Sequence, residues 1–277
     1  MAAQQSGDVV EAVSLRAAVL QVRPEERVSL PGFAGRDVRA GLEAALARCG
    51  GDIEVEALDG VRTGDLGGRF ADGAGAGRRI ARPDRTYALP VGTAGPEGSA
   101  AVGALVDALA QDGRLAVGGK PFRVTGVECE RASHESLVTD AGSLDRPTVT
   151  VRFATPTRLE AAGAPTTMPH RWAVFGSLLT AWNRTAPPTY RLGLERERLL
   201  AGTTGHLVSG SYETHAVPAG AAGDGRVEAF TGECRYVVTD DSPAVSTVVG
   251  ALGGFADYAG VGVGAERGLG TVDTTVA

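Results

Sequence analysis

Lysine, cysteine and aromatic residues are scarce in this chain. Lys120 is the single lysine among 27 basic residues, and aromatic residues make up 5% of the sequence. Three scattered cysteines without CxxC spacing argue against a disulfide framework and against a cysteine zinc site. No stretch approaches the roughly 20 apolar residues of a membrane span, and the N-terminus has no signal-peptide pattern. We therefore expect a cytoplasmic protein with reduced thiols and no membrane association.

A surplus of negative charge is present, since the net charge is −6 and the pI is near 5.3. A nucleic-acid-binding domain is usually basic. Net charge, however, describes solubility and long-range attraction rather than the contents of one groove. The preference for arginine fits a GC-rich genome, and equally fits phosphate recognition, because the planar guanidinium matches phosphate oxygens.

Hydrophobic periodicity predicts two successive units of the same kind. In the first, apolar strand patterns alternate with helical patterns, and a glycine-rich stretch without period predicts a loop over 62–85. In the second, the helix 170–188 ends at two prolines. The expected strands are 11–24, 52–59, 86–94, one or two within 113–131, 146–159, 205–217, 226–240 and 270–276, and the expected helices are 35–49, 98–113, 170–188 and 243–260.

This order predicts an α+β fold made of tandem ferredoxin-like (RRM-like) βαββαβ domains. We expect an N-terminal domain at 1–132 and a C-terminal domain at 147–277, joined by the polar segment 131–147. RRM sheets bind RNA by stacking bases on aromatic residues. Because this chain has few aromatic residues, arginines and backbone contacts would have to carry RNA binding.

The stretch GVGVGAERGLG, residues 260–270, contains five glycines between a predicted helix and the last predicted strand. A dinucleotide-binding fingerprint would follow a strand and precede a helix, which is the reverse of the order here. A helix C-cap accounts for one glycine or two, but not for five. The remaining interpretation is a loop whose backbone approaches another group closely.

Four stretches in order resemble the repeat-cleaving CRISPR-associated endoribonucleases of the RAMP superfamily, the Cas6 family. They are FATPTRL, the helix PHRWAVFGSLLTAWNRTAP, the strand AFTGECRYVV with its Phe-x-Gly, and GFADYAGVGVGAERGLG with its paired glycines. The resemblance covers most of residues 147–272. Over residues 10–130 it rests on the arrangement of elements alone.

The resemblance implies RNA contacts for the glycine-rich loop 260–270. Backbone amides in such loops can form anion-binding nests for phosphate oxygens. We expect the loop to bind RNA, with further phosphate contacts from arginines of the N-terminal domain. The predicted RNA-binding residues are Gly260, Gly262, Arg267, Gly268 and Gly270 of the loop, with Arg78, Arg79 and Arg36.

The resemblance also implies the chemistry. Family members cleave the repeat of a CRISPR transcript without a metal or cofactor, by attack of a ribose 2′-OH that leaves a 2′,3′-cyclic phosphate. Such a reaction needs a general base, an acid and positive charge around the phosphate. Many members have a histidine shortly after the first helix, but this chain has none there. The catalytic candidates are therefore His134, Tyr87 and Arg62.

Three functions remain open from the sequence. The first is a repeat-processing endoribonuclease that stays on the guide RNA and joins other Cas effector subunits. The second is a guide-RNA-binding subunit without catalysis, which the missing histidine favours. The third, a nucleotide-dependent enzyme with the glycine run as a phosphate cradle, lacks a recognisable second set of ligands.

Overall fold

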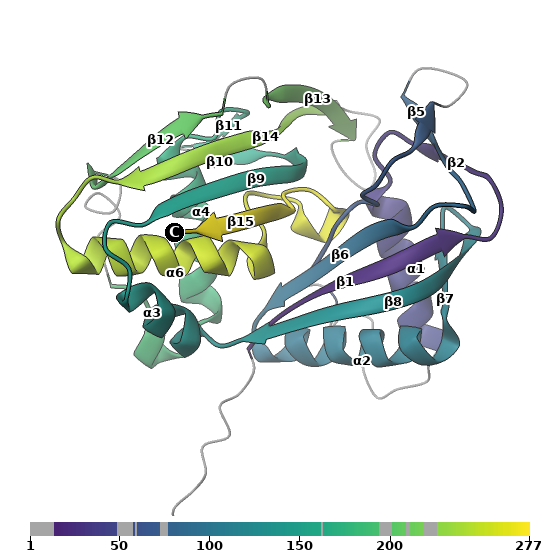
Figure 1. Cartoon of the computed structure of the whole chain (residues 1–277), viewed down its shortest axis with the longest axis horizontal. Helices are drawn as coiled ribbons and strands as arrows, with labels where there is room; N and C mark the ends of the chain where they lie inside the picture. The colour runs from purple at the N-terminus through teal and green to yellow at the C-terminus, as the bar shows by residue number, and fades with distance from the viewer. Residues whose placement is uncertain are drawn as a thin grey trace, which may run out of the picture.

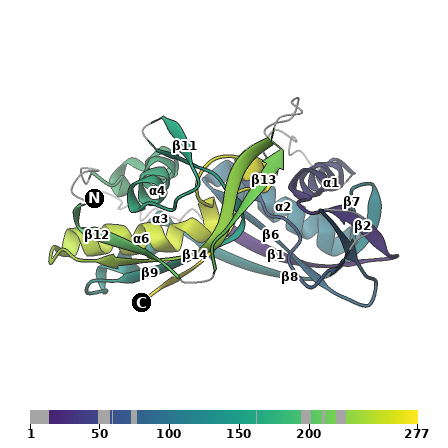
Figure 2. The same cartoon turned by 90° about the horizontal axis from the view of Figure 1, so that it is seen from above.

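The computed structural model describes residues 14–48, 58, 60–72, 77–161, 163–193, 201–208, 211–218 and 226–277. Most of the strand predicted at 52–59 lies outside these residues. Two sheets stand side by side, one in each half of the chain (Figure 1). Viewed from above, the long helices of both halves lie on the same side of the sheets (Figure 2).

The N-terminal sheet has the strand order β3-β6-β1-β8-β7, and every neighbouring pair is antiparallel. Helix α1 lies in the connection from β1 to β3, and helix α2 connects β6 to the final hairpin, β7–β8. This is the ferredoxin-like arrangement. A small sheet, β2-β5-β4, stands at one end. The elements are β1 (Leu15–Pro24), β2 (Val28–Pro31), α1 (Gly35–Arg48), β3 (Val61–Thr63), β4 (Ala71–Asp72), β5 (Arg78–Ala81), β6 (Tyr87–Ala94), α2 (Pro96–Asp112), β7 (Arg114–Val117) and β8 (Lys120–Ala132).

The C-terminal sheet repeats the pattern with the order β12-β14-β9-β15, and β13 pairs with the first half of β14. The elements are α3 (His134–Gly142), β9 (Thr148–Thr157), β10 (Leu159–Ala161), β11 (Ala164–Thr166), α4 (Arg171–Thr185), η2 (Pro188–Tyr190), β12 (Thr203–Leu207), β13 (Glu213–Pro218), β14 (Arg226–Val238), α6 (Pro243–Ala259), η3 (Ala265–Arg267) and β15 (Val272–Val276). The predicted tandem ferredoxin-like fold is confirmed.

Alternating burial explains β9, the central strand of this sheet. Val149, Val151 and Phe153 are buried against the helices, whereas the residues between them are more accessible. In β14 the pairing with β9 shifts register between Phe230 and Gly232. A Cβ at Gly232 would lie 2.9 Å from the carbonyl oxygen of Ser211. The glycine of the Phe-x-Gly motif therefore lets a neighbouring chain segment approach the strand closely.

Two sequence predictions need correction. The region 62–85, predicted as a loop, contains β3, β4 and β5, which are too short to leave a periodic pattern. The polar joint 131–147 contains helix α3. It begins with a capping box in which Ser133 and Ser136 exchange side-chain and backbone hydrogen bonds.

Candidate ribonuclease site

Arg62 of β3 joins the two halves of the chain. Its side chain is buried, and its Nη2 donates a hydrogen bond of 2.6 Å to the carbonyl oxygen of Asp257 in α6. Two glycines make room for it. A Cβ at Gly92 would lie 2.5 Å from Nη2 of Arg62, and one at Gly260 would lie 2.6 Å from its Cδ. The first glycine of the loop 260–270 therefore leaves space for an arginine from the N-terminal half of the chain.

Burial dominates the electrostatics around Arg62. It lowers the pKa of Arg62 to about 10, against the opposing influence of the Asp257 and Asp273 carboxylates. Burial also raises the pKa of Asp257 to about 6, although its carboxylate accepts hydrogen bonds from the hydroxyl and amide of Thr274. In the described part of the chain, Nε and Nη1 of Arg62 have no hydrogen-bond partner. Arg62 thus stays a buried cation that donates a hydrogen bond to the protein backbone.

A cavity of about 210 Å³ adjoins Arg62 between the two sheets. Its lining includes the carboxylates of Glu128, Glu130, Asp257 and Asp273. Four acidic groups around one arginine make this cavity unfavourable for a phosphate, because like charges repel over such short distances.

The glycine-rich loop docks onto the protein through its backbone. Its amides at Val261, Val263 and Gly270 donate to the carbonyl oxygens of Gly270, Arg158 and Pro156, at 2.8, 3.0 and 3.1 Å. The amides of Gly260 and Gly268 also donate to carbonyl oxygens, at 2.8 and 3.2 Å. Three of the amides expected to form a phosphate nest, those of Gly260, Gly268 and Gly270, therefore have partners inside the protein.

Gly268 has a left-handed backbone with φ of 89°, which favours glycine. It also meets Gly35, the first residue of α1. A Cβ at Gly35 would lie 2.3 Å from the carbonyl oxygen of Arg267 and 3.0 Å from Cα of Gly268. The loop and the start of α1, which come from opposite halves of the chain, are thus in direct backbone contact.

Beside this contact lies a cavity of about 200 Å³, which we call the α1–loop pocket. It is lined by Pro31, Phe33, Ala34, Arg36, Asp37, Arg267 and Leu269. Arg36 is exposed and Arg267 half-buried. The fold thus brings together two of the predicted RNA-binding residues, although 231 positions separate them in the sequence.

Asp37 is a lining residue that the sequence analysis did not single out. It is half-buried and belongs to the first turn of α1, next to Arg36. An acid in the first turn of a helix is common because it favours the helix dipole, so sequence alone offers little reason to choose it. Its place in the lining of the same cavity as Arg36 and Arg267 is visible only in the folded chain.

The three predicted catalytic residues are buried and lie outside the lining of the α1–loop pocket. His134 is 1% exposed, with Nδ1 at 3.1 Å from Ser14 Oγ and Nε2 at 3.2 Å from Thr185 Oγ1. Its ring packs edge-on against Trp182, and burial lowers its pKa to about 4. The Tyr87 hydroxyl accepts a hydrogen bond from the amide of Arg82. Their catalytic roles stay predictions, and this burial weighs against them.

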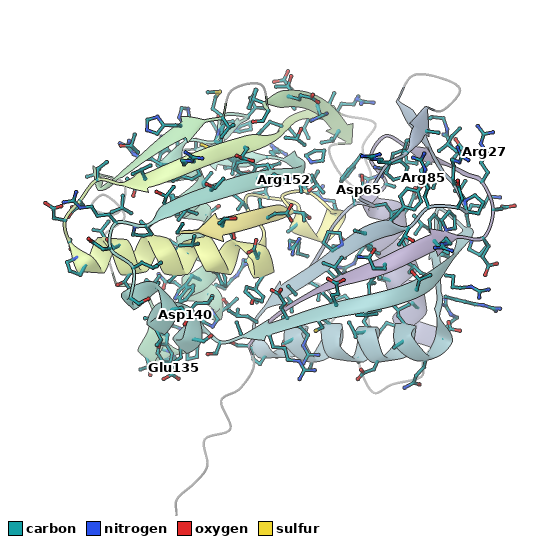
Figure 3. All side chains as sticks on the ribbon, viewed as in Figure 1. Arg27, Asp65, Arg85, Glu135, Asp140 and Arg152 are labelled. Atoms are coloured by element: carbon teal, nitrogen blue, oxygen red, sulfur yellow. The ribbon has the colours of Figure 1, made fainter. Side chains whose placement is uncertain are left out.

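Neighbouring Arg78 and Arg79 have different surroundings. Arg78 is exposed and donates to the hydroxyl and carbonyl oxygens of Ser29. Arg79 pairs with buried Asp65 and lies 4.3 Å above the ring centre of Phe70. Arg27 and Arg85 lie at the same outer end of the N-terminal half (Figure 3). Of the two predicted contacts, Arg78 is the one that presents its side chain to solvent.

The described residues contain no cluster of three or more histidine, cysteine or acidic side chains arranged to hold a metal ion. Among the helices that the structure describes, none is both long and apolar enough to cross a membrane.

The model of the family described as CRISPR-associated endoribonuclease Cas6 matches residues 151–272. The resemblance inferred from the four motifs is thereby confirmed. No curated protein matches the chain in sequence.

Solved structures of the same fold cover nearly the whole chain. A Cas6 product complex has a TM-score of 0.69 at 22% identity and covers 95% of this chain and 100% of its own. Thermus thermophilus Cas6 has a TM-score of 0.64 at 21% identity, with 95% and 98% covered. A Cas6-related protein from Pyrococcus furiosus has a TM-score of 0.63 at 10% identity, with 94% and 98% covered. At these identities the likeness shows a shared fold.

Proposed function

We propose that this protein is an endoribonuclease that binds the repeat of a CRISPR precursor transcript and cleaves it without a metal. The observation that carries the proposal is the α1–loop pocket, where Arg36 and Arg267 meet beside the loop that belongs to the Cas6-like sequence match. Two guanidinium groups at one cavity can bind a phosphate and stabilise the charge that develops on it during cleavage.

In the proposed reaction a ribose 2′-oxygen attacks the adjacent phosphorus while its proton passes to the Asp37 carboxylate. The bond from phosphorus to the 5′-oxygen breaks, and this oxygen takes a proton from water. The hydroxide that remains takes up the proton held by Asp37, which restores the carboxylate. The products are a 2′,3′-cyclic phosphate and a 5′-hydroxyl. Arg36 and Arg267 neutralise the additional negative charge on the phosphate oxygens as the five-coordinate state forms. After cleavage the protein stays on the guide RNA and joins other Cas effector subunits.

The test incubates the purified protein with an end-labelled repeat RNA from its own genome in excess EDTA, with the products separated on a denaturing gel. One cut with a cyclic-phosphate end is expected. Arg36→Ala and Arg267→Ala should each slow the cleavage about 10²–10³-fold, as the loss of one transition-state donor does. Asp37→Asn should slow it about 10²–10⁴-fold through the loss of the base.

Arg48→Ala is the matched control, because Arg48 lies at the other end of α1 in an exposed ion pair with Asp112. Such pairs contribute little to stability, so this variant should cleave at the wild-type rate. Cleavage that requires a divalent metal would overturn the metal-free mechanism.

A second candidate is a guide-RNA-binding subunit without catalysis. It is favoured by one observation, that none of the described residues lining the α1–loop pocket is a histidine. Tight binding of the repeat without any cut would establish this second function and reject the first.

A further inference from the structure

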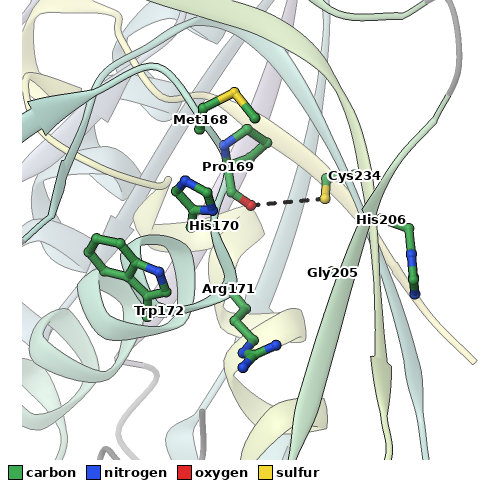
Figure 4. A pocket seen from close by; sticks show the side chains of 8 residues that line it. All are labelled: Met168, Pro169, His170, Arg171, Trp172, Gly205, His206 and Cys234. Atoms are coloured by element: carbon green, nitrogen blue, oxygen red, sulfur yellow. Dashed lines mark hydrogen bonds between the residues drawn. The ribbon is translucent and has the colours of Figure 1, made fainter. Parts of the chain in front are cut away.

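A third cavity, of about 560 Å³, opens on the C-terminal half between the start of α4 and strand β12. It is lined by Met168, Pro169, His170, Arg171, Trp172, Gly205, His206 and Cys234. None of these residues belongs to the α1–loop pocket or to the N-terminal half. Figure 4 shows His170, Arg171 and Trp172 side by side where the chain enters α4. We call this cavity the α4 pocket.

Two aromatic rings stack at its edge. The rings of His170 and Trp172 are nearly parallel, at 6°, with their centres 5.5 Å apart. Trp172 is half-buried, whereas His170 is exposed. An exposed ring at the end of a stack is a platform on which a nucleobase can add as the next layer, and such stacking accepts any base.

Arg171 lies between these two residues in the sequence and extends toward the strand that carries Gly205 (Figure 4). Its Nε is buried and has no hydrogen-bond partner within the described chain. Arg171 is half-buried in the wall of the cavity, and a guanidinium group binds phosphate oxygens through charge-assisted hydrogen bonds. Among the described residues that line the cavity, none carries a carboxylate that would repel an anion or neutralise the arginine.

The opposite wall has no side chain at Gly205. A Cβ there would lie 2.9 Å from the ring of Tyr236, which is fully buried beneath it. Met168, the one large apolar residue exposed among those described, forms another side of the opening. The α4 pocket therefore combines open space, an apolar rim, a stacking surface and an anion-binding group.

We propose that the α4 pocket binds a nucleotide of single-stranded RNA, with the base stacked on His170 and the phosphate held by Arg171. The choice of RNA rather than a free nucleotide rests on the proposed function. The site gives the C-terminal half its own contact with an unpaired part of the transcript, separate from the phosphate that is cut.

The chain carries its own reporter for this site. Trp182, the other tryptophan, is fully buried and donates a hydrogen bond of 2.8 Å from Nε1 to the carbonyl oxygen of Tyr190. A change in tryptophan fluorescence on titration with ligand therefore reports on Trp172. The probe is single-stranded hexaadenylate, with AMP titrated in parallel, and neither needs the protein to cleave RNA.

Hexaadenylate should quench the emission in a saturable way, and Trp172→Phe should abolish the signal. His170→Ala should raise the Kd about 5- to 100-fold, the range expected for the loss of one base stack. Arg171→Ala should also raise the Kd. The slope of log Kd against the logarithm of the salt concentration should fall by about 0.7, the value for one lost phosphate contact with a single strand. Arg184→Ala, in the exposed last turn of the same helix, should change neither.

Absence of saturable quenching, or quenching that persists in Trp172→Phe, would overturn the proposal. Equal Kd values for AMP and hexaadenylate would show a free-nucleotide site and would overturn the assignment to RNA. Failure of the repeat-cleavage assay with normal hexaadenylate binding would reject the proposed function and leave the α4 pocket in place.

Discussion

Nη2 of Arg62 lies 2.6 Å from the carbonyl oxygen of Asp257, which is 195 residues further along the chain. Asp257 is in the last turn of α6, where carbonyl groups lack partners within the helix. A strand of the N-terminal half therefore caps a helix of the C-terminal half, at the point where the glycine-rich loop begins.

Replacement of Arg62 by methionine should lower the free energy of unfolding by about 1–3 kcal/mol, because a buried carbonyl loses a charged donor. The cleavage rate should fall while RNA affinity changes less, since the loop loses its anchor. Urea unfolding and single-turnover cleavage measure the two effects. Arg62→Lys should restore part of both. Full stability together with complete loss of cleavage would instead support the predicted catalytic role of Arg62.

Two buried groups should give opposing pH dependences. The pKa of His134 is lowered from 6.5 to about 4, so the unfolded state takes up a proton first as the pH falls, and the native state loses stability between pH 6.5 and 4. The pKa of Asp257 is raised from 3.8 to about 6, so the native state takes up a proton first and gains stability between pH 6 and 3.8.

Each contribution amounts to about 2–3 kcal/mol, so the two largely offset each other in the wild type. His134→Gln should gain stability relative to wild type as the pH falls from 7 to 4, and Asp257→Asn should lose it. Urea unfolding at several pH values measures both differences. Differences from wild type that do not vary with pH would show that neither group titrates as described.

Two helix-terminal glycines form a matched pair. A Cβ at Gly35 would lie 2.3 Å from the carbonyl oxygen of Arg267, whereas one at Gly142 has no heavy atom within 4 Å. Gly35→Ala should cost about 1–3 kcal/mol through overpacking and should slow cleavage, because it displaces Arg267. Gly142→Ala should be neutral or stabilise by up to about 1 kcal/mol. Thermal melting and the cleavage assay compare the two, and equal effects would contradict the close contact.

Substitutions of the neighbouring Arg78 and Arg79 should have different effects, on RNA binding for Arg78 and on stability for Arg79. Arg79→Ala leaves the buried carboxylate of Asp65 without its cation and should cost about 3–5 kcal/mol. Arg78→Ala should alter stability by less than about 0.5 kcal/mol. If Arg78 contacts a phosphate, Arg78→Ala should lower the slope of log Kd for the repeat against the logarithm of the salt concentration by about 1. An unchanged slope would remove Arg78 from the interface.

Periodic segments were predictable from the sequence, and contacts between domains were not. The alternation in β9 and the prolines after α4 are local signals, and both elements form as predicted. The strands within 62–85 were missed because β3, β4 and β5 are at most four residues long and depend on pairing with β6 and β2.

The candidate site was only partly predictable for the same reason. The charge of Arg36 and Arg267 is visible in the sequence, but only the fold places them at one cavity. The imidazole of His134 suits acid–base chemistry, but nothing in its local sequence indicates that Ser14 and Thr185 occupy both of its nitrogens with hydrogen bonds. The α4 pocket depends on a glycine in β12 that carries no motif.

The long sequence separation between Arg62 and Asp257 also bears on how the chain folds. Contacts within each sheet require shorter loops to close, whereas the α1–loop pocket requires residues near 36 and 267 to meet. Closing a loop over such a separation costs conformational entropy before the distant contacts form and offset it, so this step is slow. We therefore expect refolding to build the two sheets first and to acquire RNA cleavage in a later kinetic phase, which Arg62→Met should slow.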